Sequence, residues 1–337
     1  MARLRLDHAR PTFLPIAPRG LVSDQIVFGL SRAPFGGQRL ARSAGVATEI
    51  YEPGLVVPNP FAVRALDPAT QADADWAESP VATAAPIASG AAISLGRFLT
   101  EGLAIALLQR DVIGVVPLIG AGPTPAQRAA LDALDLASDF IAIDRATRVR
   151  RMIVTQRESG AINGRVPPVH ADRFMRVAIE ALRFAVEPYE ISSQIALRRP
   201  RPIADYDVAN RLSFDSWLAS MGVVTIDPTA MRIGASDLGL LDLAAALAGA
   251  RCVVIDDPSQ AGLLGFCDPG TKVVEIAVDG WTDPRIAAMC LVFALDWRVV
   301  LCAAPAYSVS QPVPLGSTSL LRTEIDIAGV AMALDVS

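Results

Sequence analysis

Histidine is scarce in this sequence, whose 337 residues include only His8 and His170. Most zinc sites and Ser-His-Asp mechanisms depend on histidine, so these two classes are poor explanations for the chain. Cysteine is also sparse: four residues lie between Cys252 and Cys302, without any C-x-x-C spacing. We therefore expect reduced, buried thiols in a cytoplasmic protein, with no metal site and no disulfide framework.

Long apolar runs are missing from the sequence as well. Residues 91–108 are interrupted by Arg97 and Glu101, and residues 240–255 are interrupted in the same way. Neither stretch reaches the roughly 18 to 20 uninterrupted apolar residues of a membrane span. The N-terminal segment is basic but broken by prolines and has no apolar core, so we predict no signal peptide. These features predict a soluble cytoplasmic protein, either free or associated peripherally with the inner face of a membrane.

Lysine is almost absent: Lys272 is the only lysine among 30 basic residues, and the net charge is −5. Such a bias reflects the base composition of a genome more readily than selection at each position. A single arginine is therefore weak evidence of a function. Nothing in the charge distribution predicts a nucleic-acid partner.

Two domains are expected from the length, because single hydrophobic cores stop growing at roughly 250 to 300 residues. Residues 1–90 read as irregular or β-rich, and residues 91–188 contain helices and strands. In residues 189–337, apolar strands alternate regularly with helices, which predicts parallel βαβ units in a doubly wound sheet. We predict an N-terminal domain of residues 1–188, a C-terminal domain of residues 189–337, and a ligand in the cleft between them.

Three arginines follow the first strand of the C-terminal half directly. Arg198, Arg199 and Arg201 lie in the segment "ALRRPRP", where two prolines restrict the backbone. Ligands of doubly wound sheets bind at the carboxyl ends of the strands, and a guanidinium group binds phosphate through paired hydrogen bonds. The cluster is either a diphosphate clamp or a solvated basic turn.

The segment "VIDDPSQ" follows another strand and has two interpretations. Asp257 suits the N-cap of a short helix, with Pro258 at its first position and Gln260 completing a capping box. Alternatively, the backbone around Ser259 and Gln260 closes on a bound phosphate group. Glu275, which we expect at the end of the next strand, is either a ribose ligand or an exposed carboxylate.

The helix predicted around "SLGRFLTEGLAIALLQR" carries Arg97 and Glu101 four positions apart. Side chains at this spacing are close enough to pair. Glu101 is therefore either a general base that projects into the cleft or one half of a surface ion pair.

Three segments form an ordered series along the chain: "SLGRFLTEGLAIALLQR", "IALRRPRPIADYDVANR" and "CVVIDDPSQAGLLGFCDPGTKVVEI". They resemble, in turn, three motifs of glycosyltransferase family 61. These are the "GHFLLE-x-L-x-RL" helix, the "ISR" strand with its basic residues and Asn-Glu pair, and the "VVGxHGAGLxNxxFxxPGTxVIEI" segment. The resemblance spans residues 93–305, and the family includes bacterial capsular-polysaccharide transferases.

The resemblance places Arg198 on the family arginine, Asn210 on its asparagine and Glu275 on its glutamate. Two family histidines are replaced, one by Asp257 and the other by Arg97. Further departures are Pro258 and Gln260 in place of two glycines, Leu263 in place of an asparagine and Arg211 in place of a glutamate.

The resemblance implies a GT-B architecture, in which two Rossmann-like, doubly wound α/β lobes face a cleft and the C-terminal lobe binds the nucleotide sugar. Such enzymes invert the anomeric centre and need neither a bound metal nor another cofactor. The expected reaction is transfer of a hexose or pentose to a polysaccharide or glycolipid acceptor in bacterial polysaccharide biosynthesis.

The same resemblance assigns roles to the residues. Arg198, with Arg199 or Arg201, is expected to hold the diphosphate, and the backbone around Ser259 and Gln260 is expected to close around it. Asn210 and Glu275 complete the predicted nucleotide-sugar site, with Glu275 on the ribose. Asp257 or Glu101 is the candidate catalytic base.

A second hypothesis is a family member that has lost catalysis and serves as a binding or scaffolding subunit of a polysaccharide assembly system. The replaced motif residues favour this hypothesis, whereas the retained Arg198 and Glu275 favour the enzyme. A dehydrogenase is disfavoured because no strand is followed by G-x-G-x-x-G.

Overall fold

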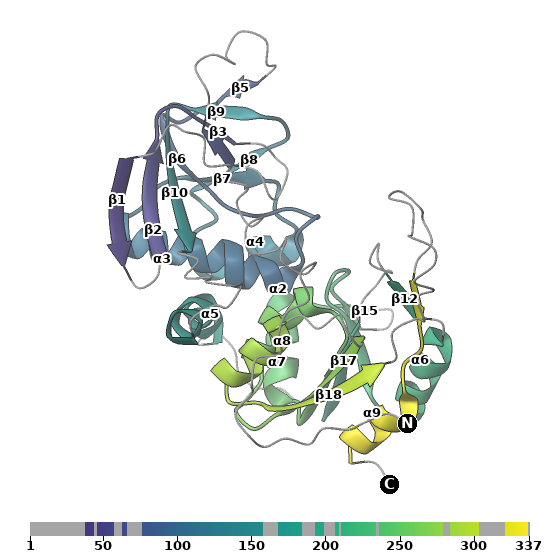
Figure 1. Cartoon of the computed structure of the whole chain (residues 1–337). Helices are drawn as coiled ribbons and strands as arrows, with labels where there is room; N and C mark the ends of the chain where they lie inside the picture. The colour runs from purple at the N-terminus through teal and green to yellow at the C-terminus, as the bar shows by residue number, and fades with distance from the viewer. Residues whose placement is uncertain are drawn as a thin grey trace, which may run out of the picture. The chain divides into compact units, whose positions relative to one another are not determined.

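The computed structural model describes residues 38–43, 46–56, 63–65, 76–157, 168–183, 193–198, 206–208, 210–233, 236–278, 284–302 and 321–335. They form two compact α/β units, one within residues 38–183 and the other within residues 193–335 (Figure 1). The predicted boundary at residues 188 and 189 lies outside the described residues. Within these ranges, no helix combines the length and apolarity needed to cross a membrane.

The unit within residues 38–183 is built on a six-stranded sheet. In spatial order its strands are β1 (Gln38–Ser43), β2 (Val46–Tyr51), β10 (Arg151–Arg157), β6 (Thr83–Pro86), β7 (Leu118–Ala121) and β8 (Phe140–Ile143). The last four strands run parallel, and β1 and β2 add an antiparallel edge. Because β10 returns to the far side of β6, the direction of winding changes between these two strands.

A second, four-stranded sheet covers one face of the first. It consists of β4 (Val63–Ala65), β3 (Gly54–Val56), β9 (Thr147–Val149) and β5 (Ala77–Glu78). The core between the sheets contains the buried side chains of Val56, Ala84, Ile119, Val149, Met152 and Val154. This unit therefore differs from the predicted doubly wound lobe, because strands and not helices cover this face.

The described helices of this unit gather beside the six-stranded sheet (Figure 1). They are α2 (Leu95–Arg97), η2 (Phe98–Leu103), α3 (Ala104–Ile113), α4 (Pro125–Ala133) and α5 (Pro168–Arg183). The first three form one continuous helix in which η2 is a π-helical turn. Ala85, Leu118 and Ile153 are buried and alternate along their strands with the residues of the other core, so they face the helical layer.

Gln127 connects the loops that follow β6 and β7. Its side chain is 1% exposed and accepts the N–H groups of Gly90 at 2.8 Å and Thr124 at 3.1 Å. It also donates to the carbonyl groups of Gly90 at 3.1 Å and Ile93 at 3.2 Å. Thr124, the N-cap of α4, accepts the Gln127 N–H in turn, so the capping box of this helix is complete.

The unit within residues 193–335 is built on a seven-stranded sheet. In spatial order its strands are β15 (Ser236–Asp237), β14 (Arg232–Ile233), β13 (Val224–Asp227), β11 (Gln194–Leu197), β16 (Cys252–Ile255), β17 (Lys272–Val278) and β18 (Asp296–Cys302). The five strands from β13 to β18 run parallel, and β14 and β15 form an antiparallel extension. Numbered along the chain, the parallel strands have the order 2-1-3-4-5, one of the two common doubly wound arrangements.

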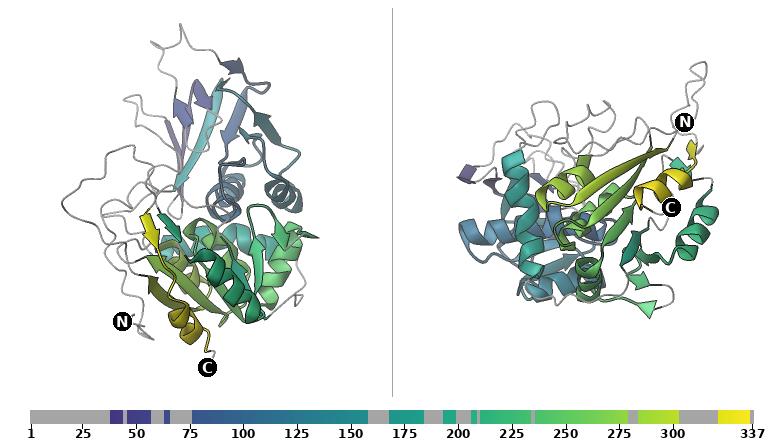
Figure 2. Two further views of the ribbon diagram at one scale, coloured as in Figure 1. Left: turned by 90° about the vertical axis from the view of Figure 1, so that its right-hand side faces the viewer. Right: turned by 90° about the horizontal axis from the view of Figure 1, so that it is seen from below.

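Helices lie on both faces of this sheet, as the alternating segments predict (Figures 1 and 2). On one face, α6 (Arg211–Ser220) and α9 (Ile327–Ala333) pack on side chains of β11, β16, β17 and β18. On the other face, α7 (Leu240–Gly249), η4 (Pro258–Phe266) and α8 (Pro284–Val292) pack against one another. A separate pair of parallel strands consists of β12 (Tyr206–Val208) and β19 (Leu321–Thr323).

All four cysteines belong to this unit and are buried without a disulfide. Burial raises the pKa of the Cys252 thiol to about 11 and raises the pKa values of Cys290 and Cys302. These thiols are therefore protonated at neutral pH and act as small apolar side chains.

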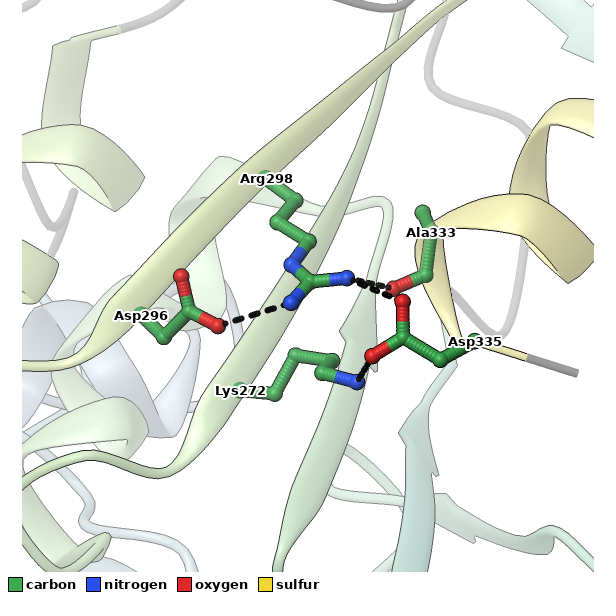
Figure 3. Close-up of polar contacts among 5 residues, drawn as sticks. All are labelled: Lys272, Asp296, Arg298, Ala333 and Asp335. Carbon is green, nitrogen blue, oxygen red and sulfur yellow. Dashed lines mark hydrogen bonds and ion pairs between the residues drawn. The ribbon is translucent and has the colours of Figure 1, made fainter. Parts of the chain in front are cut away.

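The C-terminal end of α9 is held on the sheet by an ion-pair network (Figure 3). The Asp335 carboxylate accepts hydrogen bonds from Lys272 on β17 and, at 2.8 Å, from Arg298 on β18. Arg298 also donates to the Ala333 carbonyl at 2.9 Å and to Asp296 at 3.1 Å. The Lys272 ammonium and the Arg298 guanidinium lower the pKa of the Asp335 carboxyl from 3.8 to about 2.

Replacing Gln127 is expected to destabilise the unit that contains it. Gln127→Ala leaves the buried backbone groups of Gly90 and Ile93 without their partner, which costs roughly 2 to 4 kcal/mol of unfolding free energy. Urea denaturation measures this loss. Faster hydrogen exchange of the Gly90 amide would show directly that this N–H has lost its hydrogen bond to Gln127. Arg128→Ala, at an exposed neighbour on α4, is the matched control. Equal effects of the two substitutions would contradict the role given to Gln127.

The network around Asp335 predicts a defined pH dependence. Because the folded state lowers the pKa of Asp335, its stabilisation is present above about pH 4 and is lost as the pH falls through about 2. Asp335→Asn suits the positive φ of 58° at this position and removes the charge. The variant should have a lower urea midpoint than the natural protein at neutral pH, and this difference should shrink below pH 4. A difference that stays constant down to pH 3 would contradict the prediction, and Asp237→Asn in the exposed Arg232 pair is the control.

Candidate functional site

The direction of winding of the seven-stranded sheet changes between β11 and β16. From β11 the chain crosses to β13 on one side, and later to β16, β17 and β18 on the other. Crossovers that leave in opposite directions open a crevice at the carboxyl ends of the two central strands, where doubly wound proteins bind ligands. Leu197 and Ile255, the last residues of β11 and β16, pair with each other, so Arg198 and Asp256 are the first residues beyond this edge. We call this place the switch-point edge.

Arg198 is held firmly at the switch-point edge. Its backbone N–H donates to the Ile226 carbonyl of β13 at 2.9 Å, so the sheet still fixes its main chain. Its guanidinium group forms an ion pair with Asp215 of α6, and the two side chains are 13% and 33% exposed. The predicted phosphate ligand is therefore partly buried and already paired.

Several other charges surround the Arg198 guanidinium. Burial lowers the pKa of Arg198 and the charge of Arg211 lowers it further, whereas Asp256 and Asp227 raise it. The Asp227 carboxylate accepts the N–H groups of Thr229 at 2.9 Å and Ala230 at 3.0 Å, and so closes the turn after β13. The edge is therefore a mixed cluster of arginines and aspartates, and not a purely basic site.

Asp257 acts as the N-cap of η4, as the sequence predicts. Its carboxylate accepts the Ser259 N–H at 2.9 Å, and the residue is 6% exposed. The second half of the predicted capping box differs, because the buried Gln260 side chain donates to Thr229 Oγ1 at 3.5 Å. Gln260 therefore connects the loops that follow β16 and β13.

Glu275 lies inside β17 and not at its end. The prediction that the strand ends at Glu275 is wrong, because the apolar residues after it continue to pair with β18 as far as Val278. The carboxylate is 3% exposed and accepts the indole N–H of Trp297 at 2.8 Å. The charge of Glu275 also contributes to the raised pKa of the Cys290 thiol on α8, which indicates that the carboxylate lies near that helix.

Asn210 precedes α6 but does not cap it with its side chain. Its amide accepts the Ile325 N–H at 2.9 Å and donates to the Ile325 carbonyl at 2.8 Å. The side chain that the sequence assigns to the nucleotide-sugar site thus joins α6 to the segment before α9.

Glu101 belongs to the other unit, on the π-helical turn η2. Arg97 donates two hydrogen bonds to one oxygen of this carboxylate, from Nε at 3.0 Å and from Nη2 at 2.8 Å. The two side chains are 17% and 19% exposed, so the pair is partly buried and not a solvated surface pair. Among the described residues, Arg97 is the only one that donates a hydrogen bond to Glu101.

The switch-point edge therefore brings together only some of the residues expected there. Arg198 lies at the end of β11, and Asp257, Ser259 and Gln260 follow β16. Glu275 pairs with Ile255 at the end of β16, but its carboxylate is bonded to Trp297, and Asn210 is bonded to Ile325. Arg199 and Arg201 lie outside the described residues. The sequence analysis did not include Asp215 and Arg211 among the site residues. Their spacing of four along a predicted helix could have indicated that they lie on one face.

Within the described ranges, no group of three or more His, Cys, Asp or Glu side chains is arranged to hold a metal ion.

Comparison with models of known protein families found no match to this chain, and comparison with curated protein sequences found none either.

Substitution of Asp257 separates its capping role from a catalytic role. Asp257→Ala removes an N-cap and should lower the unfolding free energy by about 0.5 to 2 kcal/mol, whereas Asp257→Asn keeps a capping oxygen and should lower it much less. Urea denaturation of both variants measures the difference. If the two variants lose equal stability, the capping role of the carboxylate is contradicted.

Proposed function

We propose that the protein is a nucleotide-sugar-dependent glycosyltransferase of the inverting type, with the donor diphosphate at the switch-point edge. The acceptor is a polysaccharide or a glycolipid, and the protein works in bacterial polysaccharide biosynthesis. Arrangement of the two α/β units as a GT-B enzyme, facing each other across a cleft, is part of this proposal.

The position of Arg198 carries the proposal. The sheet winds in opposite directions from β11, and Arg198 follows the last residue of that strand. Its main chain is fixed by the bond to Ile226 and its side chain by Asp215. A guanidinium group fixed at such a place is suited to bind phosphate oxygens.

The proposed reaction is a single displacement. The acceptor hydroxyl oxygen attacks the anomeric carbon, a new C–O bond forms, and the bond from that carbon to the diphosphate oxygen breaks. The nucleoside diphosphate leaves with the electron pair, where Arg198 stabilises its charge. The acceptor proton passes to a carboxylate, for which Glu101 and Asp257 are the candidates.

The contacts of these carboxylates favour Glu101 over Asp257 as the base. Asp257 is buried and bonded to the backbone that it caps. Both hydrogen bonds from Arg97 go to one oxygen of Glu101 and the side chain is partly exposed, so the other oxygen is the better candidate to accept a proton.

The capping role of Asp257 also favours a second function, in which the protein binds the donor or a related ligand without turnover. In the resemblance to family 61, Asp257 replaces a histidine, and in the structure its carboxylate maintains the loop. The protein would then be a binding or scaffolding subunit of a polysaccharide assembly system.

Ligand-induced thermal stabilisation tests the proposal. We expect one of a panel of nucleoside diphosphates and nucleotide sugars at millimolar concentration to raise the melting temperature, because a ligand at 100 times its Kd adds about 2.7 kcal/mol. Arg198→Ala should abolish the shift. Arg198→Lys should reduce it, because lysine keeps the charge but loses the paired hydrogen bonds. Asp237→Asn, in the exposed pair with Arg232, is the control and should leave it nearly unchanged.

Absence of a shift with every nucleotide would overturn the proposal. If binding is found, release of nucleoside diphosphate from the nucleotide sugar in the presence of acceptor distinguishes the transferase from the non-catalytic subunit.

A further inference from the structure

The ion pair between Arg198 and Asp215 joins two rigid elements. Asp215 follows Phe214 on α6, and both Phe214 and Leu218 are buried against the sheet. The Arg198 backbone bonds to β13, so the other end of the pair is also fixed. Asp215 therefore determines where the Arg198 guanidinium lies relative to α6.

Arg211 lies one helical turn before Asp215, at the first position of α6. Residues four apart on a helix share one face, so Asp215 lies beside Arg211 as well as Arg198. The two arginines are close enough for the charge of Arg211 to lower the pKa of Arg198. The Asp215 carboxylate, which pairs with Arg198, thus lies one helical turn from Arg211 on the same face of α6.

Two neighbouring guanidinium groups match the chemistry of a diphosphate. Each group can donate a pair of charge-assisted hydrogen bonds, and a diphosphate presents oxygens on two adjacent phosphorus atoms. The aspartates at the edge oppose such an anion, but Asp227 is bonded to two backbone N–H groups and Asp215 to Arg198. Asp256 also lies near enough to Arg198 for its charge to raise the pKa of that guanidinium.

We propose that Asp215 is a positioning residue that holds the Arg198 guanidinium beside Arg211, so that both arginines bind the diphosphate of the nucleotide together. This inference rests on the proposed function, since it names the side chains that would bind its leaving group. Arg211 is the second phosphate ligand, and Asp215 acts through Arg198 without touching the diphosphate.

Inorganic pyrophosphate is the probe, because it presents the diphosphate without a base or sugar. Isothermal titration calorimetry of the full chain compares the natural protein with Arg211→Gln, Asp215→Asn and the control Asp237→Asn, which removes a carboxylate from the exposed pair with Arg232. We expect Arg211→Gln and Asp215→Asn each to weaken binding roughly tenfold or more, and Asp237→Asn to change it less than about twofold.

The sign of the Asp215→Asn effect is decisive. Removing a negative charge strengthens anion binding if Asp215 acts only through its charge, whereas loss of positioning weakens binding. Asp215→Glu, which restores the carboxylate on a longer side chain, should recover part of the affinity. Melting temperatures of all variants, together with the control, show whether each protein is folded.

Three results would overturn the inference: no pyrophosphate binding by the natural protein, tighter binding by Asp215→Asn, or unchanged binding by Arg211→Gln. The two proposals fail in different ways. Nucleotide-sugar turnover with unchanged pyrophosphate binding by Arg211→Gln would overturn the inference and keep the transferase. Pyrophosphate binding that depends on both residues, without any binding of nucleotides, would keep the anion site and overturn the transferase.

Discussion

The candidate site depends on the parallel pairing of β11 with a strand on each side. Residues Ile195, Ala196 and Leu197 pair with β13 along one edge and with β16 along the other, and their side chains are buried. A strand that is bonded along both edges and covered on both faces cannot shift its register without exposing apolar side chains. The position of Arg198 is thus a consequence of the hydrophobic core, and the chain reverses its direction of winding at this strand.

The same edge places opposite charges close together, and their distances decide what the site can bind. Two unit charges about 4 Å apart interact by roughly 4 kcal/mol at an effective dielectric constant of about 20. The charges nearest to a ligand therefore affect its binding more than the net charge of the whole edge does. Arg198 has Asp215 as its ion-pair partner, with Arg211, Asp227 and Asp256 around it. A ligand at this place gains affinity by contacting guanidinium groups directly, and it loses affinity where an aspartate faces it.

The sequence predicted what depends on local periodicity and capping. The α/β alternation, the N-cap Asp257 and the location of Arg198 at a strand end could all be read from neighbouring residues. Features that depend on contacts between residues far apart in the sequence could not be predicted in this way. The Asn210 amide bonds to Ile325, 115 positions away, and the second sheet over β6 and β7 is formed by short strands with weak patterns. Similarly, the end of β17 was set by its pairing with β18, which carries the strand beyond Glu275.

The aspartates and the arginines of the switch-point edge require different explanations. Asp227 is the last residue of a parallel strand and Asp257 follows another. Both accept N–H groups of the next turn, and a fold needs such acceptors whether or not a ligand binds. Their acidity is therefore weak evidence for chemistry at the edge. A guanidinium group that is buried close to a second one does not stabilise a turn in this way. Its placement costs free energy through desolvation and through repulsion between the two positive charges. Asp215 offsets part of this cost by pairing with Arg198, so the proposed ligand site rests on the two arginines and not on the more numerous aspartates.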